Sequence, residues 1–196
     1  MRNVIFSHLV LLLLLSGCDG QTKIDPQKIY NDEFKWSIVI PENFTNVSPA
    51  DLEKLQNKGA DAIENTYGEE VVNQAKKIFA FKNADFNYLE SNYQPFDIEV
   101  DGDYLESCKN VNEIYYETFK TQMPDAVIDS STGVEKISGL DFQTFKVKIN
   151  LQNGMTMHAL MYSRLFDKKE FSVNIFYVDD KQGEKMISAW TNSKFE

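Results

Sequence analysis

An acidic run at residues 97–108, DIEVDGDYLESC, has the residue types and spacing closest to a metal-binding site. Oxygen ligands and a glycine fall on positions 1, 3, 5, 6 and 7 of the calcium-binding EF-hand loop: Asp97, Glu99, Asp101, Gly102 and Asp103. The match then fails, because Cys108 occupies position 12, where the loop needs a bidentate Glu.

The same run also fits ordinary secondary structure. Phe96, Ile98 and Val100 alternate as the inward face of a strand does, an Asp-Gly turn follows, and Asp103 suits the N-cap of a helix. We favour this interpretation and expect no metal ligand here, while weak calcium binding by residues 97–103 stays open.

Nucleophilic catalysis requires a base, which is most often His. His8 lies in the apolar N-terminal run, which leaves His158 within an apolar strand pattern. Cys108 falls on the apolar stripe of a predicted helix, so a Cys108–His158 dyad would need that stripe to open into a cleft. The sequence also lacks the short motifs of serine hydrolases, zinc peptidases and P-loop proteins. We therefore expect no catalytic residue, no cofactor and no enzymatic activity.

The N-terminal segment predicts where the protein is held. Arg2 precedes an apolar run over residues 4–15 that is too short to cross about 30 Å of hydrocarbon, as in a secretory signal peptide. The run ends in four residues that resemble a lipobox, the processing motif of bacterial lipoproteins: Leu15, Ser16, Gly17 and Cys18. The resemblance implies removal of residues 1–17, acylation of Cys18, and a mature chain anchored to a bacterial membrane with its domain outside the cytoplasm. The motif does not distinguish the inner from the outer membrane.

Composition and charge fit one acidic domain. The full chain has 196 residues and a formal net charge of −10. Residues 1–17 contain one basic residue, Arg2, and no acidic one, so their removal makes the net charge one unit more negative. That charge excludes nucleic acid and anionic headgroups as electrostatic partners. We expect a polar tether at 18–32 and a single domain at 33–196, large enough for its own core. The position of Cys108 on the helix stripe predicts a buried, unreactive thiol.

Apolar periodicity in the first half of the domain predicts both strands and helices. We expect strands at 34–40, 77–82 and 96–100, a helix that begins at Ser48 and is broken or bent near Gly59, and a second helix at 104–122. The apolar stripe of this second helix consists of Leu105, Cys108, Val111, Tyr115 and Phe119.

The second half predicts an antiparallel sheet followed by a helix. An alternating strand at 145–151 leads into Asn153-Gly154, a two-residue hairpin signal. The return strand to residue 166 is apolar on both faces, which predicts a central position in the sheet. After a further strand at 171–178, the last helix begins at Asp179 or Asp180 and ends near Phe195.

The order of these elements is that of an α+β fold in which helices cover an antiparallel sheet. Three stretches accompany it: FKWSIVIPENF at 34–44, GMTMHALMYSRLF at 154–166 and GEKMISAWTNSKF at 183–195. Together they resemble the PsbP-like α/β/α sandwich over residues 33–196. This fold occurs in a photosystem subunit, a Ran-binding nuclear import factor and DcrB-type envelope lipoproteins. The resemblance implies a binding domain and transfers no site residue.

Residues 81–96 contain the remaining candidate site. Their aromatic side chains follow no clean period, and Tyr is favoured at recognition surfaces. We hypothesise that Tyr88 and Tyr93 are partly exposed and contact a protein partner. The alternative is an irregular segment that covers the sheet edge with its aromatics buried.

These observations favour a non-catalytic, lipid-anchored cell-envelope protein whose domain binds a protein partner. The alternative is a small-molecule or lipid-binding lipoprotein with an apolar pocket between sheet and helix. Such a pocket would be lined by Phe145, Met161 or Trp190.

Overall fold

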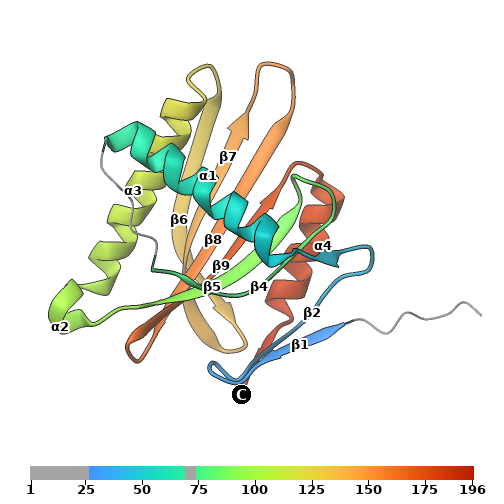
Figure 1. The fold of residues 1–196 in the computed structure, drawn as a ribbon, viewed down its shortest axis with the longest axis vertical. Helices are drawn as coiled ribbons and strands as arrows, with labels where there is room; N and C mark the ends of the chain where they lie inside the picture. Colours follow the sequence, from blue (N-terminus) through green and yellow to red (C-terminus); the bar gives the residue numbers. More distant parts are fainter. Residues whose placement is uncertain (1–26, 69–73) are drawn as a thin grey trace, which may run out of the picture.

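The computed structural model describes residues 27–68 and 74–196. They form an α+β domain in which helices cover both faces of a large antiparallel sheet (Figure 1). This sheet has seven strands in the order β3-β4-β5-β9-β8-β7-β6. Their bounds are β3 Thr45–Asn46, β4 Lys76–Lys82, β5 Tyr88–Pro95, β9 Lys169–Tyr177, β8 Thr156–Phe166, β7 Leu140–Asn150 and β6 Val127–Ile137. The predicted central position of the return strand is confirmed, because β8 lies between β7 and β9.

A second, three-stranded sheet joins the two ends of the domain. It consists of β1 (Lys28–Asn31), β2 (Trp36–Val39) and β10 (Lys194–Phe195) in the order β1-β2-β10. Two predictions are corrected here. The tether expected at 18–32 cannot extend that far, because residues 28–31 pair with β2. The last helix, α4, spans Asp180–Thr191 and stops short of β10. Cys18 and the whole signal segment lie outside the described residues.

Side-chain caps set the starts of the long helices. The Ser48 hydroxyl accepts a hydrogen bond from the Asp51 amide at 3.2 Å and caps α1 (Pro49–Tyr67), which continues unbroken through Gly59. Asp103 caps α3 (Tyr104–Gln122), as predicted, by accepting from the Glu106 amide at 2.9 Å. Among residues 27–68 and 74–196, the structure contains no helix with the length and apolarity needed to span a membrane.

The strand predicted at 96–100 is wrong. The Asp97 side chain instead accepts from the Glu99 amide at 3.1 Å and caps a single turn of helix, α2 (Ile98–Asp101). Phe96 is buried, but Ile98 and Val100 are 61% and 81% exposed. Their alternation over such a short stretch therefore does not mark a buried strand face.

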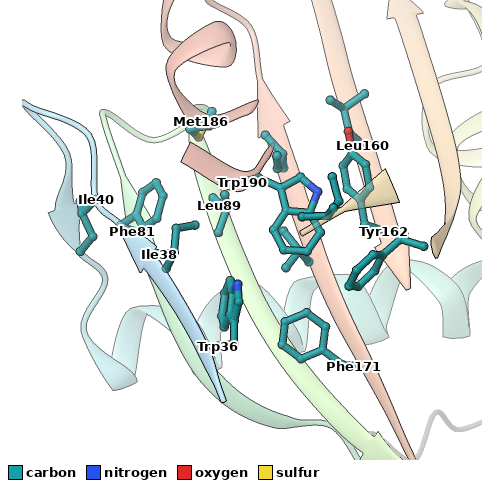
Figure 2. Packing of buried hydrophobic residues seen from close by; sticks show 14 of the residues in the cluster. Trp36, Ile38, Ile40, Phe81, Leu89, Leu160, Tyr162, Phe171, Met186 and Trp190 are labelled. Carbon is teal, nitrogen blue, oxygen red and sulfur yellow. The ribbon is translucent and has the colours of Figure 1, made fainter. Parts of the chain in front are cut away.

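One face of the large sheet carries a dense aromatic core under α4 and the small sheet. Trp36 of β2 and Trp190 of α4 are fully buried, with ring centroids 6.1 Å apart, and Figure 2 shows them together with Phe171 of β9. Inward residues of the central strands complete this core, including Leu89, Phe142, Val173 and Ile175. Burial of these large side chains is the main source of stability on this face.

The opposite face is covered by α1, which crosses it, and by α3 (Figure 1). Tyr115 and Phe119 of α3 pack with Phe145 of β7 in a second core. The predicted helix stripe is only partly right, because Leu105 and Val111 at its N-terminal end are exposed. This helix therefore contacts the sheet mainly through its C-terminal half.

The hairpin between β7 and β8 is longer than the sequence predicts. A two-residue turn would need positive φ at Asn153 and Gly154, but only Gly154 has it, at 83°. The Asn153 side chain accepts from the Met155 amide at 3.0 Å, and the Leu151 amide bonds to the Met155 carbonyl at 2.9 Å.

Candidate functional site

Tyr88 and Tyr93 lie on opposite faces of one central strand. β5 pairs with β9 residue by residue from Tyr88 to Pro95, so the segment expected to be irregular is regular sheet. Tyr88 stacks on Phe176 at 5.6 Å on the α1–α3 side, whereas Tyr93 meets Phe34 edge-on at 5.4 Å in the aromatic core. Both side chains are half-buried. They cannot form one continuous recognition surface.

A cavity of about 400 Å³ lies between the large sheet and helices α1 and α3. Its floor comes from β5, β7, β8 and β9, and its walls include Gly59 of α1 and Cys108 and Tyr115 of α3. Phe145 and Met161 line it, as the sequence predicts for a pocket between sheet and helix, but Trp190 belongs to the core on the other face.

The floor of this cavity is polar, which corrects the expectation of an apolar pocket. Four side chains from neighbouring strands form one row across the sheet: Gln143 of β7, Ser163 of β8, Ser172 of β9 and Asn92 of β5. Within it, the Ser172 hydroxyl donates to the Asn92 carboxamide oxygen at 2.6 Å.

Two carboxylates flank this polar row. Glu170 of β9 accepts a hydrogen bond from the Gln94 amide group at 2.7 Å, and Glu90 of β5 accepts from Asn174 at 3.3 Å. All four of these side chains line the cavity. Burial raises the pKa of the Glu170 carboxyl, while the hydrogen bond from Gln94 opposes that shift.

Two tyrosines face the same space. Tyr88 and Tyr115 both line the cavity. Burial raises the pKa of Tyr115, and the negative charges of Glu90 and Glu170 raise it further. Burial also raises the pKa of Tyr88, with a smaller contribution from Glu90. Both rings are therefore within electrostatic range of at least one cavity carboxylate.

Cys108 borders this cavity instead of being fully buried. It is a half-buried free thiol whose sulfur lies 3.7 Å from the Ser163 hydroxyl oxygen, and burial raises its pKa. His158 projects from the other face of β8, where its ring stacks on Tyr177 at 4.5 Å and its Nε2 lies 3.7 Å from Asp180. The structure does not bring Cys108 and His158 together.

The acidic residues around α2 are used locally. Lys168 donates to the Asp97 carboxylate at 2.7 Å, and the Asp101 carboxylate accepts from the Asp97 amide at 2.7 Å. Throughout the part of the chain that the structure describes, no group of three or more His, Cys, Asp or Glu side chains is placed to hold a metal ion.

Sequence reasoning missed the cavity floor because it followed the apolar positions of each strand. In β9, Phe171, Val173 and Ile175 alternate with Glu170, Ser172 and Asn174. The second set lies on the face that α1 and α3 cover, and its side chains line the cavity. The helices predicted on both sides of the sheet were the available signal, because they leave no open face for polar side chains.

Comparison with known proteins supports the fold. No protein-family model matches the chain, and no curated protein matches it. Among solved structures, it is similar to the solution structure of cyanobacterial PsbP (CyanoP) from Synechocystis sp. PCC 6803. The TM-score is 0.57 at 11% identity, over 93% of this chain and 99% of that chain. The domain therefore has the PsbP-like fold.

Proposed function

We propose that this protein is a non-catalytic, lipid-anchored component of the bacterial cell envelope whose domain binds a small polar solute. The observation that carries the proposal is the cavity between the large sheet and helices α1 and α3, with its floor of hydrogen-bonding side chains. Its volume of about 400 Å³ is in the range of small-molecule sites.

The polar floor favours a ligand site over a packing defect. A sheet covered on both faces ordinarily carries apolar side chains on both, because buried polar groups are costly unless they are hydrogen-bonded. Here Asn92, Ser172 and Gln143 occupy covered positions next to open space. Such convergent polar groups inside a concave site serve to orient a ligand.

The N-terminal segment supports the cellular setting. The LSGC sequence ending at Cys18 follows an apolar run too short to span a membrane. Acyl chains on Cys18 would hold the domain at a membrane surface, since two or more chains anchor a protein stably.

A protein partner is the second candidate ligand, favoured by an apolar corner at α2 and the start of α3. Ile98, Val100 and Leu105 are all more than half exposed there. A photoreactive residue in place of Val100 should crosslink to one discrete partner in intact cells, while the same residue at exposed Lys181 of α4 should not. Equal or absent crosslinking at both positions would remove this candidate.

A cavity-blocking variant tests the proposed solute site. Gly59 lines the cavity from α1, and a Cβ at this position meets no heavy atom within 4 Å, so a larger side chain can start there without a clash. We expect the ring of Gly59→Phe to fill part of the cavity. Gly59→Ala is the matched control, because it changes the same residue without filling the cavity.

The measurement is the melting temperature of the full-length protein in detergent, with and without a panel of sugars, polyols, amino acids and amines. A solute present at a hundred times its Kd should add about 2.7 kcal/mol of stability to wild type and to Gly59→Ala. Gly59→Phe should lose that gain. A gain that persists in Gly59→Phe, or no gain with any solute, would contradict the proposal.

A further inference from the structure

We propose that the cavity binds a small organic cation, a molecule that presents a protonated amine or guanidinium group to Glu90 and Glu170. This inference rests on the proposed solute-binding function and adds the charge and chemical class of the ligand.

The cavity contains negative charge without a matching positive one. Glu90 and Glu170 line it, and among the described lining residues none is Lys, Arg or His. The Glu170 carboxyl is partly buried and accepts a hydrogen bond from the Gln94 side chain, and neither its surroundings nor this partner supplies a positive charge. A buried carboxylate is costly unless it is paired, and a cationic ligand would supply the missing charge.

Lys77 does not fill this role. It feels the charge of Glu90, but it lines a neighbouring hollow on the β4 side together with Ile29 and Asn46. Burial lowers the pKa of Lys77, and the charge of Glu90 opposes that shift.

Aromatic rings add a second attraction for a cation. Tyr88 and Tyr115 line the same space, and the charges of Glu90 and Glu170 both act on Tyr115. A cation held by the two carboxylates would therefore lie close to these rings, and cation–π attraction would contribute where the cation meets a ring face.

The remaining polar groups suit a ligand that donates hydrogen bonds. The floor offers the hydroxyl and amide oxygens of Ser163, Ser172 and Gln143 beside the carboxylates. A protonated amine has three donors and a guanidinium has five, so either group can bond to several of these acceptors. The net charge of −10 also favours the approach of a cation over that of an anion.

Matched pairs of probes separate charge from shape. Isothermal titration of the full-length protein in detergent would compare 1,4-diaminobutane with 1,4-butanediol, and arginine with citrulline. At least one cationic member should bind, and its neutral counterpart should bind more than about tenfold more weakly.

Charge-neutral variants then locate the site. Glu170→Gln and Glu90→Gln keep the side-chain shape and should each weaken binding of the cation by more than about tenfold. Glu184→Gln, on the exposed surface of α4 at the opposite face, is the control and should bind like wild type. A single cooperative melting transition at or above the wild-type temperature establishes that each variant is folded.

The outcomes distinguish this inference from the function on which it rests. Equal binding of the neutral counterparts, or unchanged affinity in both Gln variants, would overturn the cation assignment. If Gly59→Phe still abolishes binding in that case, solute binding in the cavity stands. Binding of Ca²⁺ or Mg²⁺ at Glu90 and Glu170 with no response to any amine would also overturn the organic-cation assignment.

Discussion

Gly183 of α4 lies directly against the ring of Tyr177, the last residue of β9. A Cβ placed on Gly183 would fall 2.5 Å from Cδ2 of that ring, which is closer than atoms can pack. Tyr177 is itself buried beneath the helix. Helix α4 therefore approaches the sheet at a distance that only glycine permits.

Replacement of Gly183 by Ala should destabilise the protein. The added methyl must displace Tyr177 or the helix, and overpacking of this kind costs about 1–3 kcal/mol. The gain in helix propensity, about 1 kcal/mol, offsets part of that loss. Chemical denaturation of the variant measures the net change. Gly59→Ala is the control, since its Cβ meets open space, and it should not lower stability. Equal stability of the two variants would refute the packing argument.

Asn87 connects β5 to the start of α4. Its side chain is buried, and its carboxamide oxygen accepts from the amides of Val178 and Asp179 at 3.2 and 3.1 Å. Asn87→Ala leaves two backbone donors without this acceptor, so we expect a loss of about 1–3 kcal/mol in unfolding free energy. Exposed Asn110→Ala should change it by less than about 0.5 kcal/mol. If Asn87→Ala left the unfolding free energy unchanged, water would have to replace the lost acceptor.

Glu170→Gln should make the protein more stable at neutral and mildly alkaline pH. Burial raises the pKa of this carboxyl above its ordinary 4.5, so the folded state holds the proton more tightly than the unfolded chain does. The stabilisation that comes from this tighter proton binding is full below pH 4.5, and it is lost as the pH rises through the pKa of Glu170 in the folded state. The variant, which stays neutral, should therefore exceed wild type at high pH and match it at low pH. Melting temperatures of wild type and variant across that pH range test the sign of the difference in stability. Glu184→Gln is the control, and its difference from wild type should not change with pH.

Cys108 should react slowly with thiol reagents. Burial raises the pKa of the thiol, which reduces the thiolate that attacks an alkylating agent. In a Cys18→Ala variant, Cys108 is the one remaining cysteine of the two in the chain. Alkylation of this folded variant should be more than about tenfold slower than after denaturation. Similar rates in the two states would mean that the thiol is open to solvent.

Cys18 should carry the acyl chains. Cells grown with labelled palmitate should yield labelled wild-type protein that partitions into detergent, since two or more chains anchor stably. The Cys18→Ala variant should be unlabelled and should not partition. Ser16→Asn, which keeps the cysteine but alters the LSGC sequence, should reduce the labelling. An unlabelled wild type would show that the resemblance to a lipobox is misleading.

The sequence predicted helices and strands correctly where one side of the element faces a core. For helices, a capping residue also marked the start. Asp103 and the spacing of Tyr115 and Phe119 predicted α3 correctly, and the alternation from Phe171 to Tyr177 predicted β9. β5 was missed because Ser91 lies on its core face and the aromatic Tyr88 on its cavity face, so its apolar positions do not alternate.

The cavity itself depends on contacts that local patterns do not contain. Gln143, Ser163 and Ser172 become neighbours only through the strand order β9-β8-β7, and α1 covers them from a distant part of the chain. The sequence predicted a pocket lined by Phe145 and Met161, but not the composition of its floor. That composition follows from register, which is set by the whole sheet.

The pairing of β10 with β2 has a consequence for the order in which the protein can assemble. The Glu196 amide bonds to the Lys35 carbonyl at 2.9 Å, and the ring of Phe195 stacks on Trp36 at 5.9 Å. A chain that emerges from the ribosome with its N-terminus first exposes Trp36 long before Phe195 is made. Closing a contact across such a length of chain is slow. The aromatic core therefore cannot be complete before residues 190–196 have been made.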